Sequence, residues 1–414
     1  MLPAPATALT PWSSRTRTKA TIHLPNSALT VVKTGDGVVA FGSKSVEGGT
    51  YVYFLARGSG ANPTPNRNDW YLVAAAPKSG PNPPAVGPQQ SPAPEPGLTI
   101  STPVPTQPVL SNTANAAIGT YSSTIPLFYE DMVTLVERMG ELRLNTSAAT
   151  QSFLVDQDSK EVGGKEVAPP SQELPQVPDI GTWVRGFGSG ARVDNQASRT
   201  FDQEVGGVQV GIDRLRAIAG DIYVGAFAGY LYASRNFQDG GTGSTNGMTI
   251  GAYTTWIHPQ GWYADLVFKY SPLWNYFSTP TAVGTLSKGQ YDIPTLGGSL
   301  ELGRRFDFAG RRFFVEPQAQ LAGAWASAMD YQATNGLRVH GDDQYSLQGR
   351  LGLRTGLQFS LGGSRVLEPY LIASVIHEFE TGNQVQTNTT GFANNLAGTT
   401  GRFGAGVTAS VSPE

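Results

Sequence analysis

Histidines beside carboxylates are the residues whose types and spacing could support catalysis. The chain has four histidines. In "HGDD", His340 precedes Asp342 and Asp343, and in "HEFE", His377 precedes Glu378. A base hydrogen-bonded to an acid is the usual arrangement for proton transfer, so both clusters are candidates for a hydrolytic site.

Both clusters also have an ordinary structural explanation. His340 falls in a segment typical of a surface loop, where charged side chains are hydrated. His377 shares strand parity with apolar neighbours, which places Glu378 on the opposite face. His23 and His258 have no acidic residue nearby. The structural explanation is the stronger one, and we predict no catalytic residue.

Cofactor chemistry has equally little support. The chain has no cysteine and no close histidine pair, so no ligand spacing for a metal is present. The Gly-rich "GFGSGA" is not followed by a helix and does not predict a phosphate cradle. We therefore predict neither a metal site nor a bound cofactor. The missing cysteines also suit a chain that crosses an oxidising periplasm.

A larger group of ionisable residues lies in segments of alternating polarity. In "WYADLVFKY", Trp262, Leu266 and Phe268 share one face, and Asp265 and Lys269 share the other. "GVQVGID", "LGGSLELG", "FFVEPQAQLAGAW" and "LQGRLGLRTGLQF" alternate in the same way, giving about ten strands after residue 180. The charges on their polar faces are Asp213, Asp265, Lys269, Glu301, Arg350 and Arg354.

A soluble sandwich would alternate too, but two features favour a membrane barrel. The polar face mixes charges, amides and glycines, as a hydrated lumen would, and the apolar face ends in Trp256, Trp262 and Trp325, as interfacial girdles do. No segment has 18 consecutive apolar residues, so a spanning helix is not predicted. The fold class predicted is all-β, a transmembrane antiparallel β-barrel.

One helix precedes the strands. Residues 120–146, which include "LVERMGELRL", have helical periodicity, with Ser122, Ser123 or Thr124 as cap and Pro126 in the first turn. An apolar stripe runs through Leu127, Met132, Leu135, Met139 and Leu142. Such a helix spans roughly 36 Å, but its charges exclude a lipid-facing position. These polar residues are Glu137, Arg138, Glu141 and Arg143.

The order of these segments resembles a known family. A Pro-rich segment, "PNPPAVGPQQSPAPEPG", stands before the helix, and the strands follow it. "VEGGTYVYFLARG" followed by "NDWYLVA" resembles the end of a pertactin-like passenger, and "LVERMGELRL" resembles a pore helix. "GTWVRGFGS", "GGVQVGIDR", "VEPQAQLAG", "LRTG" and "EPYLIASVIHEF" resemble successive barrel strands. Together they resemble a type V autotransporter translocator, most strongly over 118–412.

The resemblance implies an organisation and a mechanism. The segments would be the end of a β-rich passenger (1–76), a Pro-rich linker (77–117), a pore-threading helix (118–150), a polar connection (151–179) and the barrel (180–414). The helix would be the tether left after passenger export, with its charges paired to those of the lumen. The implied partners are outer-membrane lipid, the chain's own passenger, the barrel assembly machinery and periplasmic chaperones.

The sequence departs from this family in three respects. Family barrels have twelve strands and end on an aromatic residue, whereas about ten strands are visible here before "VTASVSPE". The first residues lack a signal peptide. We therefore expect a fragment truncated at both ends. One subset of the family also cuts itself between two asparagines of the helix. Val133 and Thr134 stand at the matching positions, so that reaction is not expected.

The function predicted is export of the chain's own N-terminal passenger to the cell surface, with an adhesin or virulence factor as the passenger. Two alternatives remain. A ten-stranded outer-membrane protease of the omptin kind would use His340 and Asp342, and a passive porin would have an open lumen with no resident helix. The net charge of −3 gives no reason to expect a nucleic-acid partner.

Overall fold

The computed structural model describes most of the strand-rich half of the chain and parts of the N-terminal half. The described residues are 28–32, 45–57, 69–75, 108–132, 135, 138–143, 180–194, 198–217, 221–308, 312–360, 366–394 and 396–410.

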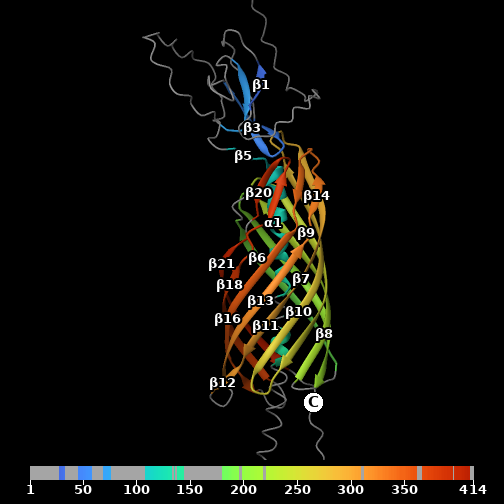
Figure 1. Cartoon of the computed structure of the whole chain (residues 1–414), viewed down its shortest axis with the longest axis vertical. Coiled ribbons are helices and arrows are strands. Elements are labelled where there is room, and N and C mark those ends of the chain that lie inside the picture. Colours follow the sequence, from blue (N-terminus) through green and yellow to red (C-terminus); the bar gives the residue numbers. More distant parts are fainter. Residues whose placement is uncertain are drawn as a thin grey trace, which may run out of the picture.

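A large antiparallel sheet forms a wall that curls around a helix (Figure 1). Each long strand pairs with the next long strand along the chain, and β6 and β21 are the two edges. Short segments β12 (Phe306–Phe308) and β17 (Phe359–Ser360) pair with β13 and β18. The long strands are β6 (Ile180–Val193), β7 (Phe201–Ala217), β8 (Asp221–Phe237), β9 (Thr242–Ile257), β10 (Trp262–Pro280), β11 (Leu286–Arg304), β13 (Phe313–Ala326), β16 (Gln344–Leu357), β18 (Val366–Glu378) and β21 (Gly398–Ser410).

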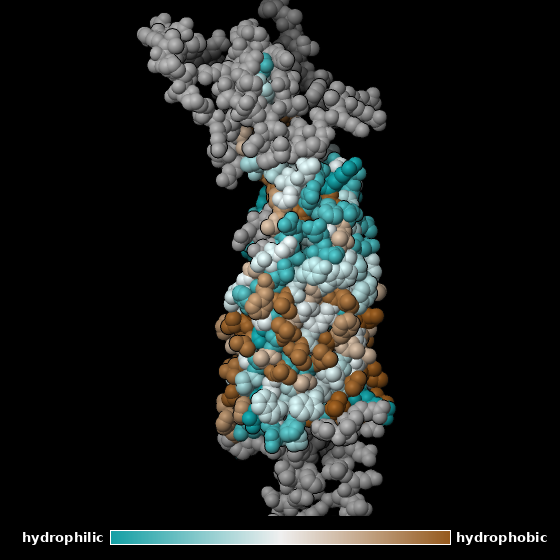
Figure 2. All heavy atoms as spheres, viewed as in Figure 1, coloured by the Kyte–Doolittle hydropathy of each residue, from teal (hydrophilic) through white to brown (hydrophobic). Residues whose placement is uncertain are grey.

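The wall turns its apolar face outward, the reverse of a soluble sandwich. On β10, Leu266 is 50 % and Phe268 is 58 % exposed, while their neighbours Asp265 and Lys269 are buried. Figure 2 shows outward apolar residues as a belt across the middle and lower wall, beneath a hydrophilic rim. Alternation therefore predicted the facing correctly, and the antiparallel barrel with a resident helix is confirmed.

The helix occupies the space inside the wall and begins earlier than predicted. α1 (Asn112–Ser122) starts at the cap Ser111, whose hydroxyl accepts from the amide of Ala114. The predicted start at 118, and with it the linker end at 117, is therefore wrong. Residues 112–119, "NTANAAIG", are small or polar except for Ile118 and carry no apolar stripe, so their sequence gave no helical signal.

A second helical segment, α2 (Thr124–Glu130), follows directly. Pro126 lies in its first turn, as predicted, but the hydroxyl of Ser123 donates back to the carbonyl of Gly119 at 3.0 Å and does not cap the segment. Helical residues recur at 132, 135 and 138–143. The predicted apolar stripe is buried throughout, at Leu127, Met132, Leu135, Met139 and Leu142. Within the described residues, no helix is both long and apolar enough to cross a membrane.

Two small sheets stand at the end of the wall where α1 begins (Figure 1). One joins β14 (Met329–Gln332), β15 (Arg338–Gly341), β19 (Gln384–Thr387) and β20 (Thr390–Ala393), and we call it the mouth sheet. The other comes from the N-terminal part of the chain, and its strands are β1 (Ala28–Val32), β2 (Val46–Gly48), β3 (Tyr51–Arg57), β4 (Trp70–Val73) and β5 (Val109–Leu110).

Candidate functional site

The lumen inside the wall is lined by charges, and helix and wall supply opposite signs. Arg138 of the helix binds Asp213 of β7, with Nη2 and Nε at 2.8 and 3.1 Å from the same carboxylate oxygen. The hydroxyl of Tyr253 donates to that oxygen at 2.7 Å, and Trp183 Nε1 donates to Tyr253 at 2.9 Å. Arg138 is therefore held by a carboxylate that is itself fixed by the wall.

A second pair joins the helix to the first strand of the wall. Glu141 accepts from Arg185 of β6 at 2.9 Å and lies 3.2 Å from Arg138 one turn back. Trp183 and Arg185 thus share the inner face of β6, while Val184 is 72 % exposed. In "TWVRGFGSG" a charged and an aromatic residue share one parity because the aromatic Trp183 faces the lumen rather than lipid.

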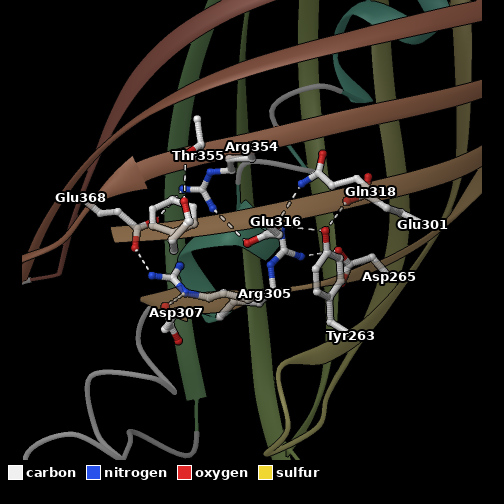
Figure 3. A network of polar contacts seen from close by, with 12 residues as sticks. Tyr263, Asp265, Glu301, Arg305, Asp307, Glu316, Gln318, Arg354, Thr355 and Glu368 are labelled. Atoms are coloured by element: carbon white, nitrogen blue, oxygen red, sulfur yellow. Dashed lines mark hydrogen bonds and ion pairs between the residues drawn. The ribbon is translucent and has the colours of Figure 1, made fainter. Parts of the chain in front are cut away.

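Arg143 joins an alternating chain of wall charges, of which Figure 3 labels Asp265, Glu316, Arg354 and Glu368. Its Nη1 lies 2.5 Å from Asp265 of β10 and its Nη2 lies 3.3 Å from Glu316 of β13. Glu316 also faces Arg354 of β16 at 3.9 Å, and Arg354 Nη2 donates to Glu368 of β18 at 2.9 Å. Positive and negative groups therefore alternate from β10 to β18, with the helix arginine as one link.

Two further groups extend this chain. Arg305 binds the second oxygen of Glu368 at 2.8 Å and Asp307 at 2.9 Å. Glu301 binds Arg350 at 2.5 Å, and the hydroxyl of Tyr263 lies 3.1 Å from Glu301. The pair of Glu301 and Arg350 belongs to the wall alone.

The fourth helix charge is Asp131, at the end of α2. It binds the ammonium group of Lys269, which is fully buried on β10 and lies 4.0 Å from the centroid of the Phe128 ring. The hydroxyl of Thr249 donates to the other oxygen of Asp131 at 2.7 Å. Both partners are thus removed from water and satisfied within the protein.

The structure places the predicted lumen charges as follows. Asp213 and Asp265 bind helix arginines, and Lys269 binds the helix aspartate. Arg354 approaches the helix beside Gly140, where an added Cβ would lie 3.4 Å from its Nη1. Glu137, Val133 and Thr134 lie outside the described residues.

Sequence reasoning missed several partners. Asp131, Arg185, Glu316 and Glu368 take part in the pairs above but were not among the predicted site residues. Strand parity could have identified the three wall residues, since each follows the alternation of its strand. Asp131 could not be identified in this way, because it lies on the helix and its partner depends on the position of the helix inside the wall.

One small cavity lies between the described residues of the helix and the wall. A cavity of about 140 Å³ is lined by Met132 and Tyr129 of the helix and by Arg350, Ile372 and Ile376 of the wall. A cavity of this size holds a few water molecules and no protein segment. The arrangement can fill, neutralise and seal a lumen.

The histidine clusters lie away from the lumen. His340, in strand β15 rather than the expected loop, lies 2.7 Å from Asp330 and 3.2 Å from Asp342. His377 faces outward, 2.8 Å from Thr399 Oγ1, while Glu378 faces inward and accepts from Ser346 at 2.5 Å. His23 lies outside the described residues. The strand parity predicted for His377 and Glu378 is correct.

Comparison with known proteins identifies the family to which this chain belongs. Residues 182–414, more than half of the chain, match the family model of the autotransporter beta-domain. The chain belongs to the autotransporter β-domain family. It is accordingly an autotransporter translocator, and the resemblance noted in its sequence is confirmed.

Individual autotransporters show the extent of the likeness. The pertactin autotransporter of Bordetella bronchiseptica is 36 % identical over 327 residues, which are 78 % of this chain and 31 % of the relative. The autotransporter adhesin/invasin TibA of Escherichia coli is 35 % identical over 191 residues, 46 % of this chain and 19 % of the relative. The crystal structure of the beta domain of Bordetella BrkA is 31 % identical and covers 56 % of this chain and 86 % of that chain, with a TM-score of 0.47. The chain spans about a third or less of the length of these whole relatives.

Proposed function

We propose that this chain exports its own N-terminal passenger across the outer membrane and remains there with the tether inside its barrel. The observation that carries the proposal is the path of the chain. The strands N-terminal to the helix stand at one mouth of the wall, and the helix runs from that mouth into the lumen (Figure 1). This is the path that a segment left behind after outward passage would take.

The contacts at the mouth support an outward position for the N-terminal strands. β5, directly before α1, pairs with β3. The hydroxyl of Thr50 donates to the carbonyl of Thr387 in the mouth sheet at 2.9 Å, and that of Ser111 donates to the carbonyl of Gly49 at 2.7 Å. Asn112 N donates to Glu47 at 3.1 Å. Once folded against the mouth sheet, the N-terminal strands would resist return through the lumen.

The charge pairs give the helix its second role. Four helix charges each have a wall partner, and the cavity between Tyr129, Met132 and the wall is small. We infer that the resident helix plugs the pore after export, because a filled and neutralised lumen excludes hydrated ions. An open porin would lack such a segment.

We propose that the passenger is an adhesin or virulence factor, since TibA is described as an adhesin/invasin. We place the passenger end in residues 1–76, the Pro-rich linker from 77 to about the start of β5, and a polar connection in 151–179. The translocator itself works by steric and electrostatic means rather than by catalysis. With Val133 and Thr134 in place of two asparagines, we propose that the helix is not cut by asparagine chemistry.

Surface display tests the export proposal. The complete reading frame, with an epitope tag inserted ahead of residue 20, would be produced in an outer-membrane-bearing host. We expect externally added protease to remove the tag from intact cells while the barrel stays in the membrane. A matched variant lacking 112–143 should insert but leave the tag protected. If the tag of the parent is protected in cells whose barrel is inserted, the export proposal is wrong.

A further inference from the structure

Arg235 is a buried cation with no carboxylate beside it. It lies on β8 with 1 % of its surface exposed. Its Nε contacts Ser123 Oγ at 3.1 Å and Gln203 Oε1 at 2.9 Å, and its Nη1 donates to Thr245 Oγ1 at 2.9 Å. All these acceptors are neutral, whereas the lumen arginines described above face acids. Within the described part of the chain, this guanidinium has no ionic partner, which is costly in a buried place.

The third guanidinium nitrogen of Arg235 is one of several buried hydrogen-bond donors that have no acceptor in the described structure. Arg235 Nη2 is buried and has no hydrogen-bond partner among the described residues. Thr245 Oγ1, which accepts from Arg235, donates its own proton to Asn275 Oδ1 at 2.6 Å. In this structure the amide oxygen of Asn275 faces the Thr245 hydroxyl, which leaves its amide nitrogen on the other side. Asn275 Nδ2 therefore points elsewhere, and it too is buried and unpartnered.

Two tyrosines, on β11 and β14, also have buried hydroxyl groups without a hydrogen-bond partner in the described structure. Tyr291 on β11 is the direct ladder partner of Asn275, and its side chain is buried. The ring of Tyr331 on β14 stacks on that of Tyr291 at 4.8 Å. Both hydroxyl oxygens are buried and without a hydrogen-bond partner in the described structure. Donors from β8, β10, β11 and β14 are thus linked to one buried positive charge by hydrogen bonds, strand pairing and ring stacking.

We propose that Arg235, Asn275, Tyr291 and Tyr331 form a binding site for a small monovalent inorganic anion of the chloride class. Such an ion neutralises one guanidinium and accepts hydrogen bonds from amide and hydroxyl donors while donating none. A divalent anion would leave the site with excess negative charge. Because Arg235 also contacts Ser123, at the junction of α1 and α2, the bound ion helps to hold the helix against the wall.

Bromide provides the direct test, since it replaces chloride and is located by anomalous scattering. Crystals of the full chain in detergent would be grown with bromide as the only halide. We expect an anomalous peak within hydrogen-bond reach of Arg235 Nη2 and Asn275 Nδ2. Clear density for these side chains without such a peak would overturn the proposal.

A second test measures the halide dependence of stability. The rate of heat unfolding in dodecyl sulphate, followed by the shift in gel mobility, would be compared in chloride and in gluconate at equal ionic strength. We expect several-fold slower unfolding in chloride, because an ion that binds only the folded state stabilises it. Arg235→Met should abolish the difference, while Arg185→Gln, which removes another lumen arginine, should keep it. Equal rates in the two salts for the parent protein would contradict the proposal, even if Arg235→Met does not fold.

Discussion

Arg143 of the lumen helix and Asp265 of β10 form an ion pair of 2.5 Å whose two side chains are only 4 % and 1 % exposed. The pair joins helical residues 138–143 to the wall at a point where water cannot compensate either charge. Its guanidinium also lies 3.8 Å from the ring centroid of Tyr263, so charge and aromatic surface act together. The helix is thus fixed by specific partners and not merely enclosed.

Removing the charge of one partner of this pair should destabilise the protein. We expect Asp265→Asn to reduce the free energy of unfolding by about 3–5 kcal/mol, because Arg143 loses its shortest ionic contact while remaining buried. Urea titration in detergent, followed by tryptophan fluorescence, measures the loss. Asp202→Asn, at an exposed position of β7, is the control and should change stability by less than about 0.5 kcal/mol. A loss at Asp265 no larger than at Asp202 would show that the pair does not fix the helix.

Gly49 should control docking of the N-terminal strands on the mouth. It has a φ of +82°, and an added Cβ would lie 2.3 Å from Asn388 Nδ2. Gly49→Ala should therefore make the β2–β3 hairpin more sensitive to trypsin on intact cells. Gly336→Ala is a matched control, since Gly336 has a φ of +92° but no atom near the added Cβ. Equal sensitivity in both variants would mean that backbone strain alone, and not contact with the rim, explains the effect.

The mouth sheet should loosen as the pH rises. The hydrogen bond that the His340 ring donates to Asp330, with a smaller contribution from Asp342, holds the pKa of His340 above its usual value. The pairing therefore stabilises fully below the unfolded pKa of about 6.5 and is lost as the pH rises through the higher folded pKa. Hydrogen exchange of β14 and β15, corrected for intrinsic rates, should accelerate between those limits. His340→Gln should remove this step, and His377→Gln should keep it. If the exchange of the parent shows no such step, the pairing does not stabilise the sheet.

Strand number and facing were predictable because they depend on local alternation, as in Asp265 and Lys269 against Leu266 and Phe268. The lumen partners were predictable only as a set. Which acid meets Arg138 or Arg143 depends on how far the helix is inserted and how it is rotated, and neither is encoded in the spacing of one segment. The helix start at Asn112 was missed because small residues suit a narrow lumen and leave no amphipathic pattern. Gly119, for example, lies where an added Cβ would be 3.0 Å from the Phe201 ring.

The conductance of the barrel in planar bilayers tests the central claim that the helix plugs the lumen. We expect deletion of 112–143 from the complete reading frame to leave membrane insertion intact, because strand pairing and the outer apolar face are unchanged, and to raise the single-channel conductance sharply. Reversing the charges of Arg138, Glu141 and Arg143 together should raise it less, and more at low than at high salt, because pairs reached by water are partly screened. If the inserted deletion variant conducts no more than the parent protein, the helix is not the plug.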